Sequence, residues 1–449
     1  MFGSPGNQQR STHMTSVATK TSHVFHSWSA QEHVDPLHAV AGSGASFQDD
    51  KGQEYLDFAA QLVNLNLGHQ HPRLIKAIKT QAETLTTIQP AFANDARSEL
   101  ARLIAEAAPP ALNHVFFTNG GADANEHAVR MARLHTGRRK IMSMYRSYHG
   151  ATATAISLTG DPRRWPNEPS DSSVVHFFGP YTYRSAFWAS CEKEECERAL
   201  AHLEAQIVLE GAATIAAIII ETVVGTNGIL VPPAGYLPGV RALCDKYGIV
   251  YIADEVMAGF GRTGTMFAVE NFGVEPDLIT FAKGVNSGYV PLGGVIISDA
   301  IVATFADTVY PGGLTYSGHP LACAVGVETF AVFEDEDILA RTQYLGREIV
   351  GPFLEKLARE VELVGEVRGL GLFWAIELVK DRTTREPLVP FNPSSEENAP
   401  MLRIGAALKA AGLWPMIQQN RIHIAPPLII SETELVRGLE IIRQVLKAQ

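Results

Sequence analysis

Short apolar runs alternate with longer amphipathic stretches between residues 114 and 298. The runs are apolar without a break, which is typical of strands that are buried on both faces of a parallel sheet. The stretches between them, such as residues 124–137 and 235–248, have the apolar spacing of helices. This order predicts an α/β fold with a mostly parallel sheet covered by helices on both faces. The expected strands cover residues 114–118, 140–144, 174–178, 214–221, 249–255, 278–283 and 293–298.

The pattern differs at the two ends of this region. Before it, a short hairpin is expected through Asp50-Lys51-Gly52, followed by a glycine-histidine loop near Gly68. After about residue 330, long charged helical stretches lead to a second hairpin over residues 364–381. Residues 385–400 are rich in proline and serine, which predicts a surface loop. The C-terminal part therefore predicts a separate, smaller α/β domain.

Composition excludes several classes of partner. The chain has 449 residues, of which 46% are hydrophobic, and 48 acidic against 37 basic residues give a net charge of -11. No lysine and arginine cluster stands out, so no nucleic-acid partner is expected. The longest apolar runs, such as residues 214–220, are too short to cross a membrane. Residues 1–22 are polar, lack the apolar core of a signal peptide and are predicted to form a disordered tail.

The four cysteines are too few for the disulfide framework of a secreted protein, so a cytoplasmic location is expected. Cys191 and Cys196 lie in a charged helical stretch without a matching pair of histidines or cysteines. No metal site is expected there, and both are predicted to be surface thiols.

Lys283 follows an apolar strand and precedes a flexible glycine turn. A lysine at a buried strand end is partly desolvated, which lowers its pKa and favours the neutral amine that attacks a carbonyl. The alternative is a lysine at an ordinary strand end with its ammonium in water. The position matters because ligands of a parallel sheet bind beyond the carboxyl ends of its strands.

Other strand ends are polar as well. Residues 118–126, TNGGADANE, predict a strand, a glycine turn and a helix N-terminus, which suits a phosphate but also occurs as an ordinary turn. Asp254 ends another strand, where a buried carboxylate needs a cation, either a protonated ring nitrogen or Arg262 in a structural ion pair. Glu221 also ends a strand and has the same two interpretations, a contact with a ligand or a structural ion pair. Together with Lys283, these groups match the aldehyde, phosphate and pyridine nitrogen of pyridoxal phosphate.

Four segments, in this order, resemble the class III, fold-type I, pyridoxal-phosphate-dependent aminotransferases, and Lys283 follows Asp254 by 29 residues (283 minus 254), as in that family. The likeness runs from about residue 25 nearly to the end. It implies a large cofactor-binding domain at residues 66–328 and a small domain made of residues 23–65 and 329–449. The segments are TNGGADANE (118–126), ADEVMAGFGRTG (253–264), ITFAKGVNSGYVPLGGV (279–295) and LTYSGHPLACA (314–324).

By this resemblance Lys283 forms the Schiff base and moves the proton, and Asp254 holds the pyridine nitrogen protonated. Glu221 orders the site beside the cofactor's hydroxyl. Thr315 reaches the phosphate of the neighbouring subunit's cofactor, which implies a homodimer. The other cofactor-binding residues that the resemblance implies are Tyr148 and His149 on one face of the ring, Val256 on the other face, and Gly121 and Ala122 at the phosphate.

Departures from the family pattern narrow the branch. Ala122 replaces the serine common in the glycine turn, so one hydroxyl contact is lost while the backbone amide remains. Met257 replaces the glutamine of the ornithine, acetylornithine and 4-aminobutyrate members, which, with TYSGHP and SGYVPLGG, favours the amine:pyruvate or ω-amino-acid:pyruvate branch. Arg421 is a candidate for the substrate carboxylate, although it comes later than expected, and a structural pairing is the alternative. Trp28, Leu62 and Val63, with Tyr148, are expected to line an apolar substrate pocket, or else to pack in the core.

The resemblance implies ping-pong transfer of an amino group from a primary amine or ω-amino acid donor to a keto-acid acceptor, with pyruvate as the expected acceptor. An aminomutase or racemase of the same fold is the alternative. A nucleotide-binding oxidoreductase fits less well, because it explains neither Lys283 nor the lack of a G-x-G-x-x-G pattern.

Overall fold

A computed structural model of the protein describes residues 23–168 and 171–449, so the expected tail at residues 1–22 lies outside the described residues. The chain divides into two compact units, Met1–Ala39 and Val40–Gln449. In the described part of the first unit, a 3-10 turn, η1 (Gln31–His33), follows the exposed side chains of Phe25 and Trp28.

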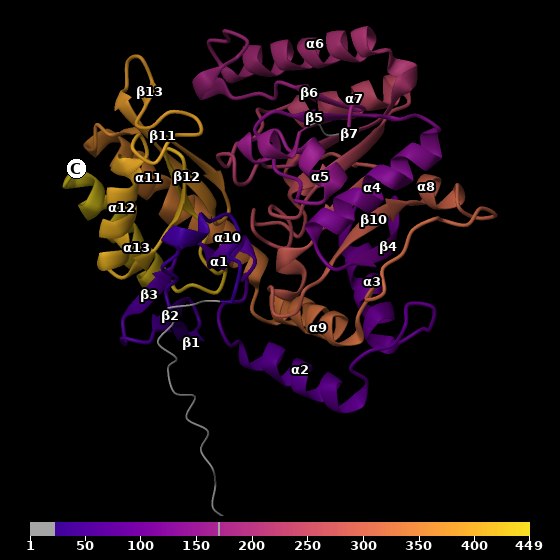
Figure 1. Ribbon diagram of the computed structural model, residues 1–449, viewed down its shortest axis with the longest axis horizontal. Helices are drawn as coiled ribbons and strands as arrows, with labels where there is room; N and C mark the ends of the chain where they lie inside the picture. Colours follow the sequence, from indigo (N-terminus) through magenta and orange to yellow (C-terminus); the bar gives the residue numbers. More distant parts are fainter. Residues whose placement is uncertain (1–22, 169–170) are drawn as a thin grey trace, which may run out of the picture. The chain divides into compact units, whose positions relative to one another are not determined.

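The second unit contains a seven-stranded sheet in the order β4-β10-β9-β8-β7-β5-β6 (Figure 1). β10 runs antiparallel to both of its neighbours, and all other pairs are parallel, which confirms the predicted mostly parallel sheet. Each expected strand is present, with ends that differ by at most two residues. The strands are β4 (Leu112–Thr118), β5 (Lys140–Met144), β6 (Val174–Phe177), β7 (Ile215–Glu221), β8 (Val250–Asp254), β9 (Leu278–Phe281) and β10 (Gly293–Ser298).

Helices cover both faces of this sheet. Along β7 every side chain is buried, and alternate residues point to opposite faces. Ile218 and Ile220 pack with side chains of α3 (Asp95–Ala107), α6 (Glu192–Glu210) and α7 (Tyr236–Tyr247). Ala217 and Ile219 pack instead with side chains of α4, α5 and α8. These helices cover α4 (Gly121–Thr136), α5 (Ala153–Leu158) and α8 (Asp299–Ala303).

Both predicted hairpins are present in smaller sheets. The hairpin through residues 50–52 joins β2 (Ser46–Asp49) and β3 (Glu54–Asp57) in the sheet β1-β2-β3-β14, where β14 comes from the C-terminal part of the chain. The hairpin over residues 364–381 belongs to the sheet β11-β12-β16-β15, with β13 beside β12. The strands are β1 (Ala39–Ser43), β11 (Val364–Leu370), β12 (Phe373–Asp381), β13 (Glu386–Pro387), β14 (Leu413–Trp414), β15 (Met416–Gln418) and β16 (Arg421–Ile424).

The domain boundaries at residues 66 and 328 stay a prediction. One helix, α9 (Pro320–Asp335), crosses the second of them without a break and contributes Cys323 to one hydrophobic core and Phe333 to another. The second core also contains side chains of β3, β12 and the C-terminal helices. The remaining helices are α1 (Ala60–Val63), α2 (Pro72–Thr84), α10 (Ile338–Tyr344), α11 (Gly351–Glu360), α12 (Ala399–Ala410), α13 (Glu432–Lys447) and a π-helical turn, η7 (Leu345–Val350).

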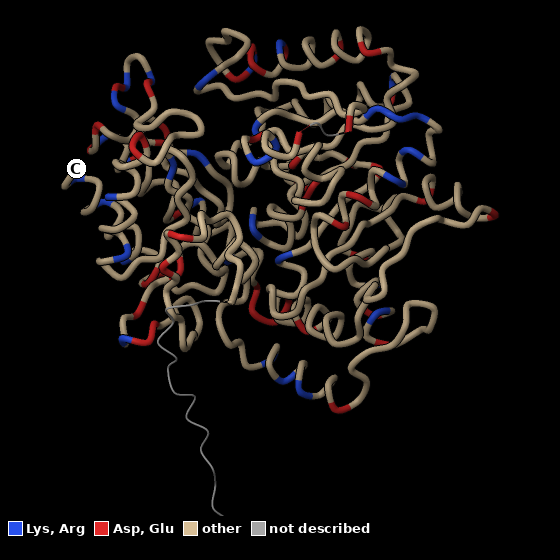
Figure 2. The backbone as a smooth tube through the Cα atoms, viewed as in Figure 1, with Lys and Arg blue, Asp and Glu red and all other residues tan. Residues whose placement is uncertain are grey.

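Acidic and basic residues are mixed along the outer helices and loops (Figure 2). Cys191 is exposed as predicted, but the prediction for Cys196 is wrong, because Cys196 lies on the face of α6 that packs into the core. Within residues 23–168 and 171–449, no group of histidine, cysteine, aspartate or glutamate side chains could hold a metal ion. In the same residues, every helix is too short or too polar to cross a bilayer.

Arg262 connects three distant segments of the second unit. Its guanidinium is fully buried and donates to the carbonyl oxygens of Leu372 (3.0 Å) and Pro426 (2.6 Å) and to Oδ1 of Asn66 (2.9 Å). Burial lowers the pKa of this guanidinium to about 9. Asn66 in turn donates to the carbonyl oxygen of Phe260 (2.7 Å), next to the same turn.

Replacing this arginine tests how much the connection stabilises the fold. We expect Arg262→Met to lower the free energy of unfolding by about 3 kcal/mol, because three buried acceptors lose their donor and only part of the loss is offset by removing a desolvated charge. The midpoint of thermal or urea unfolding measures the change. Arg347→Met, at a side chain that is 78% exposed, is the control and should change the free energy by less than about 0.5 kcal/mol. Equal midpoints for the two variants would contradict the interpretation.

Candidate functional site

The carboxyl ends of β4, β7, β8 and β9 meet at one edge of the seven-stranded sheet, and a cavity of about 430 Å³ lies there. Apart from Thr315, all residues that the sequence assigns to the catalytic groups and to the cofactor's ring and phosphate line this cavity, although they come from segments far apart in the chain. They are Gly121, Ala122, Tyr148, His149, Glu221, Asp254, Val256 and Lys283.

Asp254 ends β8, and its carboxylate is 3% exposed. Oδ1 accepts from the backbone N–H of Val256 (3.0 Å), and Oδ2 accepts from Nδ2 of Asn125 (2.8 Å) and contacts Nδ1 of His149 (2.7 Å). Asn125 is itself oriented by the hydroxyl of Thr280, which donates to its Oδ1 (2.8 Å). The predicted alternative, an ion pair with Arg262, is wrong, since that guanidinium bonds to other acceptors.

Lys283 begins a 3-10 turn, η6 (Lys283–Asn286), two residues after β9 ends. Its φ of 46° lies in the left-handed region, which few residues other than glycine adopt, and turns the side chain out of the strand ladder. The side chain is half-buried, and burial lowers the pKa of its ammonium, although the charges of Asp254 and Glu221 oppose the shift. The ammonium has no hydrogen bond or ion pair to any described residue.

Glu221 ends β7 beside Asp254, its register partner in β8. Its two oxygens accept from the backbone N–H groups of Tyr148 (2.9 Å) and Gly225 (2.8 Å). Burial nevertheless raises the pKa of this carboxyl to about 7, and the nearby charge of Asp254 adds to the shift. Glu221 therefore exchanges a proton near neutral pH.

The glycine turn between β4 and α4 faces the same cavity. α4 begins at Gly121 without a side-chain cap, so the first amides of the helix have no partner within it. A β-carbon on Gly121 would lie 2.7 Å from Cγ1 of Val256, which explains why this position needs glycine. Free amides and the positive end of a 16-residue helix are suited to an anion such as phosphate.

Leu62 and Val63 are not among the residues that line the cavity. They belong to α1, in which Gln61 and Leu62 depart from helical backbone angles. Leu62 is 58% exposed, whereas Val63 is buried with Val223 and Ile229. The next residue, Asn64, does reach the cavity wall.

Three further predicted residues lie elsewhere. Thr315 is exposed in the turn before α9. Trp28 belongs to the first unit and is 69% exposed. Arg421 begins β16 and is buried; its guanidinium donates to Oε1 of Gln419 (2.9 Å), while its Nε has no partner among the described residues. Burial lowers the pKa of Arg421 to about 10, against the opposing charges of Tyr181 and Glu377.

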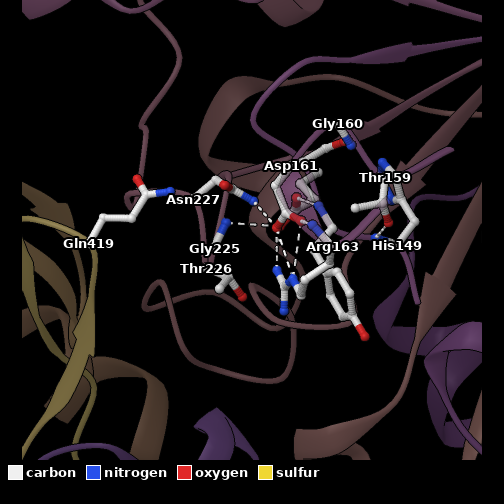
Figure 3. A network of polar contacts seen from close by, with 12 residues as sticks. His149, Thr159, Gly160, Asp161, Arg163, Gly225, Thr226, Asn227 and Gln419 are labelled. Carbon is white, nitrogen blue, oxygen red and sulfur yellow. Dashed lines mark hydrogen bonds and ion pairs between the residues drawn. The ribbon is translucent and has the colours of Figure 1, made fainter. Parts of the chain in front are cut away.

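Sequence reasoning missed the polar groups that hold the predicted ones in place. Asn125 lies within the TNGGADANE segment, but no local signal connects it to a carboxylate 129 residues later. A second missed group consists of Asp161, Arg163 and Asn227 (Figure 3). Asp161 accepts hydrogen bonds from the other two, and the guanidinium of Arg163 lies over the ring of Tyr148. The only sequence signal for this group is the pair of adjacent arginines, Arg163 and Arg164, in GDPRRW (160–165).

These residues fit pyridoxal phosphate, the cofactor that the sequence predicts. A half-buried lysine without a partner is available to an aldehyde, and a fixed carboxylate is available to a protonated ring nitrogen. The uncapped start of α4 is available to a phosphate. The three groups line one cavity, as the dimensions of a single small molecule require.

Comparisons with known proteins agree with this chemistry. The sequence profile of the family described as Aminotransferase class-III matches residues 28–446. The solved structure of taurine:2-oxoglutarate aminotransferase from Bifidobacterium kashiwanohense, in complex with PLP and glutamate, is 44% identical, with a TM-score of 0.92 over 95% of each chain. A thermostable (S)-enantioselective ω-transaminase from Thermomicrobium roseum is 39% identical, with a TM-score of 0.86 over 92% of this chain and 93% of its own.

Relatives with described activities include one transferase and one racemase. Putrescine–pyruvate aminotransferase of Pseudomonas aeruginosa is 34% identical and covers 90% of this chain and 89% of its own length. Leucine/methionine racemase of Thermococcus litoralis has the same identity and coverage. The similarity therefore extends over nearly the whole length of each chain and not over single motifs.

The raised pKa of Glu221 predicts how stability depends on pH. Because the folded state holds this proton up to about pH 7 and an unfolded glutamate loses it near 4.5, stability should fall as the pH rises through this window. Glu221→Gln removes the proton exchange. We therefore expect the difference between the unfolding midpoints, variant minus wild type, to increase from pH 5 to pH 8, whatever its value at pH 5.

Glu204→Gln is the matched control, since a hydrogen bond from Lys246 lowers the pKa of this exposed carboxyl and leaves it charged throughout the window. A difference between Glu221→Gln and wild type that stays constant with pH would show that Glu221 is already charged at pH 5.

Proposed function

The chain belongs to the class III aminotransferases and uses pyridoxal phosphate, and from this premise we propose that it moves an amino group from a primary amine or ω-amino acid to a keto acid. We propose pyruvate as the acceptor, which is the acceptor named for the relative from Pseudomonas aeruginosa. The order is ping-pong, so the keto product of the donor leaves before the acceptor binds.

One observation carries the proposal: Lys283 and the fixed carboxylate of Asp254 line one cavity at the ends of neighbouring strands, together with a helix N-terminus free to bind phosphate. The cofactor, when bound, supplies a carbonyl for the amine and a ring that accepts the electron pair of the broken C–H bond. The protein's own residues hold the reactants and move the proton.

Lys283 is the proposed catalytic amine. Burial lowers its pKa and raises the fraction of neutral amine, which can attach to the cofactor's carbonyl. Its Nζ, when free, would be the base that takes the proton from the substrate carbon and the acid that gives it back. Its lack of a competing partner among the described residues leaves Nζ available for both steps.

Asp254 is proposed to keep the ring nitrogen protonated. The N–H groups of Val256 and Asn125 and the imidazole of His149 keep its carboxylate in one orientation. We propose that Tyr148 and His149 lie against one face of the ring and Val256 against the other. The amides of Gly121 and Ala122 are the proposed phosphate ligands.

Glu221 is proposed to order the site beside the cofactor's hydroxyl group. Its carboxyl is tied to the backbone of Tyr148 and of Gly225, so its position sets the position of the ring's stacking partner and of a cavity-wall loop. A carboxyl that titrates near pH 7 can also share a proton with that hydroxyl.

The substrate pocket is proposed to include Leu62 and Val63 beside Tyr148. Leu62 is exposed and adjoins the segment that reaches the cavity at Asn64, which supports a role at the pocket entrance. Arg421 remains a proposed ligand of a substrate carboxylate, supported by its unpartnered Nε.

A racemase or aminomutase is the second candidate, because leucine/methionine racemase of Thermococcus litoralis is as similar as the putrescine–pyruvate enzyme. It would use the same lysine and aspartate, and no keto product would leave. We also propose a cytoplasmic location, since the four free cysteines fit a reducing compartment.

An absorbance titration tests the function. With a donor amine and no acceptor, the visible band of the purified enzyme should give way to the near-ultraviolet band of the cofactor's amine form, and pyruvate or 2-oxoglutarate should restore it. Lys283→Ala should lack the visible band and the transfer activity, because no amine remains to hold the carbonyl. Lys246→Ala, a surface lysine paired with Glu204, should behave as wild type. A visible band that persists with every donor, with racemisation of an amino acid, would favour the second candidate.

We propose a homodimer in which Thr315 contacts the phosphate of the partner's cofactor. Light scattering should give twice the chain mass. Thr315→Ala should weaken pyridoxal phosphate binding by about ten-fold, the usual effect of losing one hydrogen bond to a charged group. Thr383→Ala, at an exposed turn after β12, is the control. A monomer that keeps full affinity for the cofactor would contradict the proposal.

A further inference from the structure

An arginine is stacked on one wall of the cavity. The guanidinium of Arg163 lies 3.6 Å from the centre of the Tyr148 ring, and Tyr148 lines the cavity that also contains Lys283. Arg163 belongs to a short 3-10 segment, η2 (Pro162–Asn167), and its side chain is 29% exposed. Its side chain is therefore partly exposed, and it adjoins the cavity through Tyr148, since Arg163 is not itself among the residues that line the cavity.

Asp161 holds this guanidinium in one orientation. Its buried carboxylate accepts from Nε of Arg163 at 3.1 Å and 3.0 Å and also bonds to one terminal nitrogen and to the backbone N–H of Arg163. Asn227, from the loop after β7, donates to the same carboxylate (3.0 Å). Figure 3 shows this group, with Thr226 beside it. The orientation of Arg163 is thus set before any ligand binds.

One edge of the guanidinium remains free. The second terminal nitrogen of Arg163 has no hydrogen bond to any described residue, whereas Asp161 takes the opposite edge. Thr226, the residue before Asn227, lines the cavity. The sole described partner of its hydroxyl is the sulfur of Met257, at 3.8 Å. A guanidinium edge and a hydroxyl are the donors that bind a carboxylate or a sulfonate.

The charge of Arg163 reaches the catalytic lysine. It is one of the groups that hold down the pKa of Lys283, although burial is the larger cause. The guanidinium thus acts electrostatically on the amine of Lys283. A donor molecule with its amine at Lys283 would extend its far end along the wall formed by Tyr148 and Thr226, toward the guanidinium of Arg163 that is stacked on Tyr148.

We propose that Arg163, oriented by Asp161 and Asn227, binds the anionic end of the amino donor. The enzyme then prefers ω-amino acids and aminosulfonates to amines of the same length that have no anionic group. This inference rests on the proposed transfer reaction and names the donor class. Arg163 is here a specificity residue, and Asp161 and Asn227 are its positioning residues.

The test compares matched donors on the pyridoxal-phosphate-loaded enzyme. 5-Aminopentanoate, 3-aminopropanesulfonate and n-pentylamine are each titrated without acceptor, and the loss of the visible band gives the rate and its half-saturation. In wild type, the anionic donors should react with the higher efficiency. Arg163→Gln should lower their efficiency by about 10- to 100-fold, mainly through weaker binding, and change n-pentylamine by less than about three-fold.

Arg164→Gln is the matched control, since the next arginine pairs with Glu168 (2.9 Å) and lies over the ring of Tyr145 and not over that of the cavity-lining Tyr148. It should leave the ratio between the donors unchanged. Arg163→Lys keeps the charge but loses the planar fork, so an intermediate loss is expected, and this variant decides the matter if Arg163→Gln does not fold. Calorimetric binding of pentane-1-sulfonate, which has no amine, should weaken by about ten-fold in Arg163→Gln and remain unchanged in Arg164→Gln.

The outcomes separate two failures. A wild-type enzyme that converts no donor would overturn the transfer reaction itself. A wild-type enzyme that converts n-pentylamine as well as 5-aminopentanoate, or an Arg163→Gln variant that loses both donors equally, would overturn only the anion site. Equal binding of pentane-1-sulfonate by wild type and Arg163→Gln would do the same.

Discussion

A carboxylate buried at the end of a parallel strand is the constraint on which the cavity depends. Asp254 cannot remain charged there without donors, and those donors come from its own strand end, from α4 and from the segment after β5. The second turn of α4 must therefore approach β8, which brings the uncapped start of the helix to the cavity. The same requirement positions His149, and with it Tyr148, on the cavity wall. One buried charge thus fixes the relative positions of three segments.

The lysine of the cavity has no direct ion pair with either of its carboxylates among the described residues. In the described residues, the ammonium of Lys283 contacts neither Glu221 nor Asp254, so burial shifts the pKa of the lysine downward and that of Glu221 upward. Both groups are brought nearer to neutrality, which is the condition for moving protons at physiological pH. The two carboxylates on neighbouring strands have different partners: Glu221 accepts from two backbone N–H groups, whereas Asp254 accepts from one backbone N–H and from Asn125 and contacts His149.

The packing around the cavity joins parts of the chain that are distant in sequence. Arg262 bonds to segments near residues 66, 372 and 426, and α9 contributes to two hydrophobic cores. β14 adds the C-terminal part of the chain to a sheet begun by the N-terminal hairpin. The GFGRTG segment, which contributes to the family resemblance, therefore has a structural role: its arginine holds the surrounding segments together and does not neutralise Asp254.

The sequence by itself determined the strands, the two hairpins and the polar residues at the strand ends, because apolar runs and turn residues act locally along the chain. It also determined that Lys283, Asp254, Glu221 and the glycine turn share one cavity, since parallel strands end at a common edge. Only the tertiary structure decided which donors hold Asp254, that Cys196 is buried, and that Arg163 is bonded to Asp161 and stacked on Tyr148. Asp161 and Asn227 are 66 residues apart and lie in loops, whose paths depend on the packing of the elements that they connect and not on any local pattern.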